Sequence, residues 1–296
     1  MSSRRLDTGT DELLGEVRDG VAIFTLNRPE ARNALSDRLT PALRAGIAAC
    51  DGDPEVGAFL ITGAGGAFCA GGDVKDMGAS PPRADVSLEA RAAELIRRQR
   101  MLTGALVRSR KPSIAALPGP AAGAGLSLAL ACDLRLAAAS AFVRTAYVRI
   151  GLPGDYGVNW LLTRAVGPGR ARELMLLSED LDAERCRQLG LVNRVLPDDE
   201  LFAAAFDLAA RLAAGPRHAI GLIKDNLDDA MRFDFLPALD AEAARMVRHS
   251  GSVETREAIR AYVERRPADF AAVAREVRGE PRSLGRLGAL LNHLSA

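Results

Sequence analysis

One stretch, Lys111 to Asp133, constrains the fold more than any other part of the chain. It opens with a short apolar run, Ser113 to Leu117, that predicts a buried strand, and the turn Pro118-Gly119-Pro120 follows. The small residues Gly123-Ala124-Gly125 then lead into Leu126 to Ala131, an apolar run that predicts a buried helix. Small side chains leave the backbone N–H groups of a helix start uncovered, and these groups can stabilise an oxyanion. Close helix packing is the other interpretation of the same residues.

Two further loops share this character. The apolar run Val56 to Thr62 predicts a strand, and the glycine-rich turn Ala67 to Asp73 comes soon after it, with Gly71 and Gly72 adjacent. A third loop, Leu152 to Gly157, carries a single acid, Asp155. Two convergent backbone N–H groups and one carboxylate are a minimal set for enolate chemistry on a carbonyl compound.

Composition excludes several other classes. The chain has 296 residues, 48% of them hydrophobic, which is enough for one large domain or for one domain and a smaller cap. A formal charge of +1 gives no argument for nucleic acid or an anionic membrane as a partner. The four cysteines lie far apart without metal-ligand spacing, so we expect reduced thiols in a cytoplasmic protein. Met1 to Asp11 lacks a signal-peptide core, and no apolar stretch is long enough to span a membrane.

Familiar cofactor and nucleophile motifs are missing. No dinucleotide-binding or phosphate-binding glycine motif follows a predicted strand, and Ser127 does not lie in a nucleophile elbow. The histidines His218, His249 and His293 all fall in the C-terminal third, far from the glycine loops. We therefore expect no metal and no bound cofactor, and a site built from backbone amides and carboxylates.

The remaining elements follow local patterns. Leu13 to Leu26 predicts a hairpin around Asp19-Gly20, and Ser36 is a plausible N-cap for a helix to about Cys50. Leu88 to Arg110 predicts one long helix, and Val74 to Pro82 a loop. Alanine-rich helices are predicted from Leu201 to Val277, and a last short helix from Leu287 to Leu294.

The ordered motifs resemble those of the crotonase, or enoyl-CoA hydratase/isomerase, superfamily over roughly Val17 to Val277. The motifs that carry the resemblance are Asn27-Arg28-Pro29, Asn33-Ala34-Leu35, Phe68 to Asp73, the stretch ending in Ala131-Cys132-Asp133, Ile150-Gly151-Leu152 and Leu189 to Val192. Each motif alone is weak, whereas the set in this order is specific.

The resemblance implies an α/β fold, a crotonase spiral of ββα turns with a helical C-terminal trimerisation region. The spiral would occupy residues 12–200, the oligomerisation helices 201–277 and an extra tail 278–296, with a homotrimer or hexamer as the assembly. Gly72 and Ala124 would supply the two N–H groups that hold the oxygen of an acyl-CoA thioester. The adenine end of coenzyme A, which is part of the substrate, would meet the segment from Phe68 to Ala70. Arg32 and Ala34 complete the predicted coenzyme A contacts.

The departures from the family pattern bear on the chemistry. Family hydratases carry two glutamates where this chain has Ser127 and Tyr147, and the third acid position, used by several isomerases, matches Asp155. The runs Ala121 to Gly125, Leu128 to Asp133 and Arg149 to Leu152 look most similar to those of the phenylacetate-pathway enoyl-CoA isomerases. Packing or water binding is open for Ser127, and lining of the acyl pocket for Tyr147. Asp155 could instead cap a helix, and Trp160 belongs to the core or the pocket wall.

Three functions remain open. The first is an isomerase that moves a double bond in an enoyl-CoA with Asp155 as proton shuttle. The second is an enoyl-CoA hydratase that works with one acid and a water. The third is a non-catalytic acyl-CoA-binding protein that kept the fold.

Overall fold

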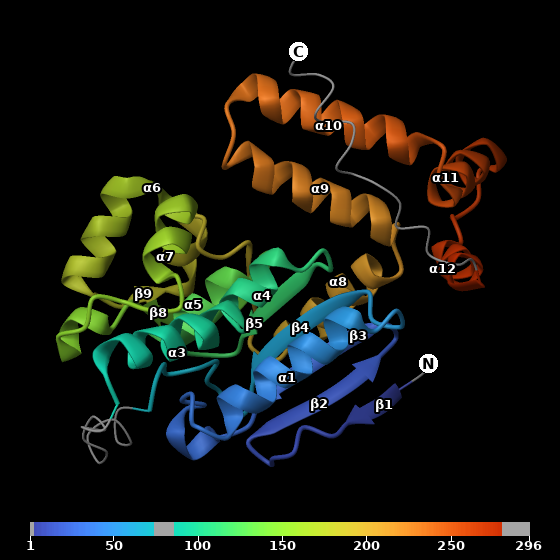
Figure 1. Ribbon diagram of the computed structural model, residues 1–296. Coiled ribbons are helices and arrows are strands. Elements are labelled where there is room, and N and C mark those ends of the chain that lie inside the picture. Colours follow the sequence, from blue (N-terminus) through green and yellow to red (C-terminus); the bar gives the residue numbers. More distant parts are fainter. Residues whose placement is uncertain (1–2, 74–85, 280–296) are drawn as a thin grey trace. The chain divides into compact units, whose positions relative to one another are not determined.

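The computed structural model describes residues 3–73 and 86–279 (Figure 1). The predicted loop Val74 to Pro82 and the predicted helix Leu287 to Leu294 lie outside these residues, as does nearly all of the predicted tail. The chain forms two compact units, Met1–Asp225 and Asn226–Ala296. The cavity described below belongs to the first unit.

The first unit is built on a seven-stranded sheet in the order β1-β2-β3-β4-β5-β7-β10. The strands are β1 (Ser3–Leu6), β2 (Leu13–Arg18), β3 (Val21–Leu26), β4 (Ala58–Gly63), β5 (Ser113–Leu117), β7 (Leu134–Ala138) and β10 (Arg194–Leu196). The predicted hairpin is confirmed as β2 and β3, joined by Asp19 and Gly20, both with positive φ. From β3 to β10 all neighbours are parallel, and β4 and β5 are buried almost throughout. Continuous apolar runs suit strands that are covered on both faces.

The first unit also contains a second, smaller sheet of three short strands. It contains β6 (Ala121–Ala122), β8 (Phe142–Arg144) and β9 (Leu181–Asp182). Twice the chain adds a strand to the large sheet, then one to the small sheet, then a helix: β5-β6-α5 and β7-β8-α6. The segment after β4 takes a similar path, since Cys69 forms an isolated bridge with Ala121. This is the predicted succession of ββα turns, and the α/β class is confirmed.

The helices mostly match their predicted ranges. They are α1 (Leu39–Gly52), α3 (Leu88–Arg100), α4 (Thr103–Arg108), α5 (Ala124–Ala131), α6 (Val158–Leu177), α7 (Ala183–Gln188), α8 (Leu201–Ala213), α9 (Arg217–Ala230), α10 (Phe235–Ser250), α11 (Val253–Glu264) and α12 (Phe270–Gly279), with 3-10 turns η1 (Pro29–Ala31) and η2 (Tyr147–Ile150). The single helix predicted over Leu88 to Arg110 is wrong. Leu102 leaves the helical conformation and is fully buried, so that α4 packs against α5 while α3 buries no side chain.

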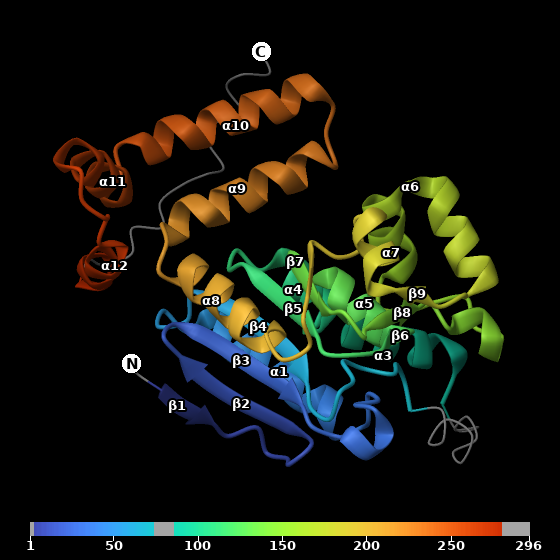
Figure 2. The ribbon, with the colours of Figure 1, turned by 180° about the vertical axis from the view of Figure 1, so that it is seen from behind.

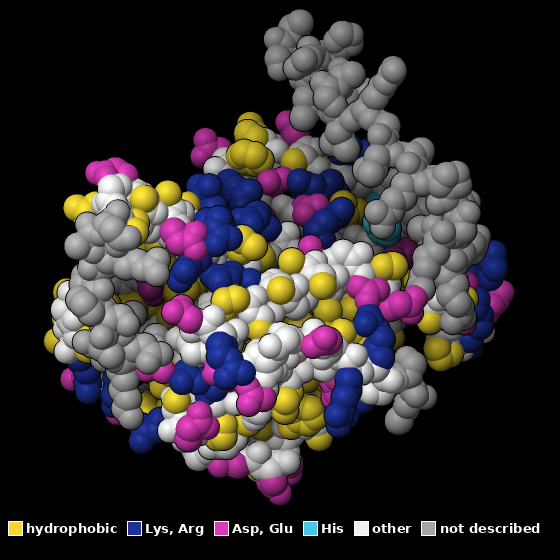
Figure 3. Space-filling view, turned by 60° about the horizontal axis from the view of Figure 1, so that its bottom comes forward, with side chains coloured by type: hydrophobic (Ala, Val, Ile, Leu, Met, Phe, Trp, Pro, Cys, Tyr) yellow, Lys and Arg dark blue, Asp and Glu magenta, His cyan; other side chains and the backbone are white. Residues whose placement is uncertain are grey.

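Helices cover both faces of the large sheet. α8 packs on β4 and β5, whereas α1 lies against β2 and β3 on the opposite face (Figures 1 and 2). The predicted boundary at residue 200 separates the spiral from helices expected to form an oligomer. A single chain does not test oligomerisation, so this boundary stays a prediction. Basic and acidic side chains both occur across the face seen in Figure 3, in keeping with the near-zero net charge.

Candidate active site

A cavity of about 540 Å³ lies where the two glycine-rich loops meet α1, α3 and the segment from η2 to α6. Its lining includes Gly71 and Gly72 from the first loop, Gly123 and Ala124 from the second, and Asp155. Three segments that the sequence predicted to carry the chemistry therefore reach one cavity.

Backbone hydrogen bonds hold the two loops side by side. The amide of Ala122 donates to the carbonyl oxygen of Cys69 at 2.9 Å, and the amide of Cys69 donates to the carbonyl of Pro120 at 3.1 Å. The approach leaves no room for a side chain at Gly125, where an added Cβ would lie 2.2 Å from the Cys69 oxygen. The same small residues thus allow the close packing and bring the start of α5 to the cavity lining.

The amides of Gly72 and Ala124 are free of the regular hydrogen-bond ladders. Leu35 pairs with the loop by donating to the Gly71 oxygen at 2.7 Å and accepting from the Asp73 amide at 3.4 Å, which directs the intervening Gly72 amide away from this pairing. Ala124 is the first residue of α5, so its amide has no intrahelical acceptor. The preceding Gly123 has φ 52° and ψ −125°, a conformation that suits glycine. Two donors at one cavity wall can hold a carbonyl oxygen as it becomes negative.

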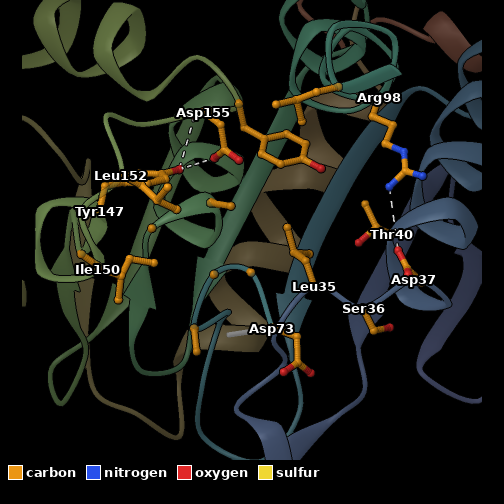
Figure 4. Close-up of a pocket in the computed structure, with 18 of the residues that line it drawn as sticks. Leu35, Ser36, Asp37, Thr40, Asp73, Arg98, Tyr147, Ile150, Leu152 and Asp155 are labelled. Carbon is orange, nitrogen blue, oxygen red and sulfur yellow. Dashed lines mark hydrogen bonds and ion pairs between the residues drawn. The ribbon is translucent and has the colours of Figure 1, made fainter. Parts of the chain in front are cut away.

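Asp155 belongs to a chain of hydrogen bonds that the sequence did not reveal. The Tyr147 hydroxyl donates to Asp155 Oδ1 at 2.7 Å, and the two side chains point toward one another (Figure 4). The hydroxyl of Ser127 lies 3.0 Å from the Tyr147 oxygen and is fully buried. Since the tyrosine proton is directed to the carboxylate, the serine is placed to donate to the tyrosine. The helix-cap interpretation of Asp155 is wrong, because Gly157 is the N-cap of α6 and no side chain caps that end.

Burial changes the pKa values of both Asp155 and Tyr147. It raises the pKa of the Asp155 carboxyl above its ordinary value, and the hydrogen bond from Tyr147 partly offsets that rise. Burial and the nearby Asp155 charge also raise the pKa of Tyr147, which therefore stays a neutral donor. A carboxylate with a raised pKa is better suited to accept and return a proton near neutral pH.

Two other carboxylates line the cavity, and both are paired with arginines. Asp73 accepts two hydrogen bonds of 3.1 Å from Arg28, in line with its predicted structural role, and Asp37 lies 3.8 Å from Arg98 on the opposite wall (Figure 4). In the described residues Asp155 has no cationic partner. It is the lining carboxylate best placed to act as a base.

The other predicted site residues are dispersed. Ala70 lines the cavity, whereas Phe68 and Ala34 are buried and Arg32 is exposed outside it. Trp160 does not line the described cavity: it is 46% exposed and stacks with the guanidinium of Arg164 at 3.5 Å. The coenzyme A contacts proposed for the first four residues stay predictions.

Some lining residues were not predicted from the sequence. Thr40 and Arg44 come from α1, and Tyr156 follows Asp155 with a positive φ of 49°. Arg44 shares a helix face with buried Leu43 and Ile47, and an arginine on an apolar face is a signal that could have found it.

Other kinds of site find little support in the described ranges. No group of three or more histidine, cysteine, aspartate or glutamate side chains there could hold a metal ion. No helix in the same ranges is both long and apolar enough to cross a bilayer. All four cysteines are buried free thiols, and burial raises the pKa of Cys69 to about 12, so this thiol is unreactive.

Comparison with known proteins points in one direction. The family model described as enoyl-CoA hydratase/isomerase matches residues 16–273. The chain is 36% identical over 262 residues to 1,2-epoxyphenylacetyl-CoA isomerase of Escherichia coli, covering 87% of this chain and 97% of that protein. It is 41% identical over 212 residues to a probable enoyl-CoA hydratase of Mycobacterium tuberculosis, covering 71% and 78% respectively. The crystal structure of an enoyl-CoA hydratase from Polaromonas superposes with a TM-score of 0.80 at 32% identity, covering 86% of this chain and 98% of that one.

Proposed function

Because the chain belongs to the enoyl-CoA hydratase/isomerase family and shares its crotonase fold, we propose that it is an enoyl-CoA isomerase in which Asp155 carries the proton. The observation that carries the proposal is the cavity itself. Gly72, Ala124 and Asp155 all line it, and in the described residues Asp155 has no cationic partner. Coenzyme A enters as part of the substrate.

The reaction needs only one acid–base group. With the thioester oxygen held by the two amides, the Asp155 carboxylate removes a proton from C2 of a 3-enoyl-CoA. The electron pair moves toward the thioester and gives a dienolate, whose negative oxygen the amides stabilise. Asp155, now a carboxylic acid, returns the proton to C4, and the double bond lies between C2 and C3. Tyr147 keeps the carboxylate oriented throughout.

An enoyl-CoA hydratase is the second candidate. Several relatives are named probable enoyl-CoA hydratases, and the hydroxyls of Ser127 and Tyr147 lie beside Asp155 where they could help to hold a water. The number of carboxylates argues against hydration, because this reaction needs a base for the water and an acid for the α-carbon. Both usual glutamate positions of the resemblance hold neutral side chains here, Ser127 and Tyr147.

A thioester panel separates the candidates. Purified protein is mixed with 2-enoyl-CoA and 3-enoyl-CoA of equal chain length, and the products are followed by absorbance and mass. Conversion of the 3-enoyl thioester without a mass change supports isomerisation, whereas gain of one water supports hydration. Binding without turnover of any thioester would contradict both.

Tyr147→Phe is expected to shift the pH profile. Removing the hydrogen bond withdraws a stabilising contact from the Asp155 carboxylate, so the pKa of Asp155 rises further. Since the base must be ionised, activity falls as pH drops through this pKa, and the acid limb should move to higher pH in the variant. The kcat profile of each protein measures the limb. If the acid side of the kcat profile lies at the same pH in both proteins, the hydrogen bond from Tyr147 does not lower the pKa of Asp155.

We also propose that the chain assembles as a trimer or a dimer of trimers. The helices of the second unit leave large apolar side chains exposed, among them Phe235, Leu236, Met246, Val247 and Val263. Exposed apolar surface of this extent is typical of a protein interface. Light scattering at micromolar protein should report three or six chains, and a stable monomer would refute the assembly.

A further inference from the structure

Arg44 is a buried cation in the cavity that the proposed reaction does not use. It comes from α1, lines the cavity and is 7% exposed. Its Nη1 atom is buried without a hydrogen-bond partner in the described part of the chain. A buried guanidinium nitrogen without an acceptor is unfavourable, because arginine does not lose its charge and neither protein nor water satisfies that N–H group.

The other charged side chains of the lining each have a protein partner. Arg98 pairs with Glu94 at 2.6 Å and with Asp37, Arg144 pairs with Asp180, and Arg149 donates to the Ser178 carbonyl at 2.7 Å. The carboxylates Asp73 and Asp155 are bound by Arg28 and Tyr147. Within the described lining, Arg44 is therefore the charge that a ligand would have to satisfy.

Two side chains with hydroxyl groups, Thr40 and Tyr156, line the same cavity as Arg44. Thr40 lies one helical turn before Arg44 and is 7% exposed, and Tyr156 is 9% exposed. The Arg44 charge acts on the Tyr156 hydroxyl and opposes the rise in the pKa that burial of this tyrosine causes. A cation with hydroxyl groups beside it suits a carboxylate, which accepts several hydrogen bonds at once.

We propose that Arg44 binds a carboxylate carried by the acyl chain, so that the preferred substrates are coenzyme A monothioesters of dicarboxylic acids. The inference rests on the proposed function, in which the amides of Gly72 and Ala124 hold the thioester end. Arg44 is then reached by the other end of the acyl group. It acts as a specificity residue and takes no part in proton transfer.

Binding of saturated thioesters tests this without any turnover. Calorimetry compares butanoyl-CoA with succinyl-CoA, hexanoyl-CoA with adipoyl-CoA, and octanoyl-CoA with suberoyl-CoA, using wild type, Arg44→Met and Arg44→Lys. For the pair whose length matches the cavity, wild type should bind the dicarboxylic thioester about 10- to 100-fold more tightly. Arg44→Met should remove this preference while leaving the monocarboxylic affinity in place, and Arg44→Lys should keep part of it.

Three results would overturn the proposal. Wild type could bind every monocarboxylic thioester as tightly as its dicarboxylic counterpart, or bind neither kind. Arg44→Met could weaken both members of a pair equally, which would mean that Arg44 contacts the coenzyme A portion or supports the fold. If Arg44→Met does not fold, the wild-type comparison and Arg44→Lys decide the matter. Because saturated thioesters cannot isomerise, a failure of the isomerase proposal is seen separately, in the enoyl-CoA panel.

Discussion

Asp155→Asn is expected to lower turnover of a 3-enoyl-CoA by on the order of 10²-fold or more. An amide cannot accept the C2 proton, yet its oxygen can still accept the hydrogen bond that Tyr147 donates to Oδ1. The variant should therefore keep the shape of the cavity and lose the base. Initial rates at the absorbance band of the conjugated thioester measure the effect, with the fold checked by circular dichroism.

Asp182→Asn is the matched control. It makes the same chemical change at the start of α7, where the Asp182 side chain caps the helix outside the cavity, and asparagine caps about as well. Ser127→Ala removes only the hydroxyl that contacts Tyr147, at the end of the hydrogen-bond series away from Asp155. This variant should lose much less turnover than Asp155→Asn. A folded Asp155→Asn protein with wild-type turnover would exclude Asp155 as the proton carrier.

Ala124→Pro is expected to lower turnover by roughly 10²- to 10³-fold. Proline removes the amide hydrogen that we assign to the thioester oxygen, and its ring occupies the space into which that hydrogen points. The first position of a helix tolerates proline because its N–H has no intrahelical acceptor, so α5 should remain folded. Steady-state kinetics with 3-enoyl-CoA, and melting temperatures for both proteins, test the expectation.

Ala124→Gly is the companion variant, since it keeps the amide hydrogen and should remain within about tenfold of wild type. Comparable turnover of a well-folded Ala124→Pro protein would show that this amide does not stabilise the transition state. Loss of activity in both variants would point to packing of α5 instead.

Much of the fold could be predicted because strong local signals agree with it. Asp19-Gly20 supports the positive φ angles of the hairpin, and the apolar run Ser113 to Leu117 becomes a strand buried along its whole length. The helix break at Leu102 was missed because apolar residues continue across it, although the poor helix formers Thr103 and Gly104 follow directly and are a local signal for a break. Tertiary packing agrees with that signal, since Leu102 is drawn into the core.

The loops that line the cavity could be predicted from the sequence, whereas the contacts between side chains in it could not. The two glycine-rich loops were singled out by their small residues after strands, and the family resemblance pointed to Gly72 and Ala124 within them; both line the cavity, while their role as donors stays a prediction. The contact between Tyr147 and Asp155 depends on Ala146 and Gly151, which flank η2 in the left-handed conformation and turn the chain back. Alanine gives no local signal for such a conformation, so Tyr147 was assigned only to the pocket wall.

Fate of a labelled proton tests the central claim most directly. A 3-enoyl-CoA carrying deuterium at C2 is converted in ordinary water, and the product is analysed by mass spectrometry and by nuclear magnetic resonance at C4. If Asp155 carries the proton between the two carbons, the product gains no water and part of the deuterium appears at C4. A product that has gained one water, or an isomerised product with no deuterium at C4, would contradict the account.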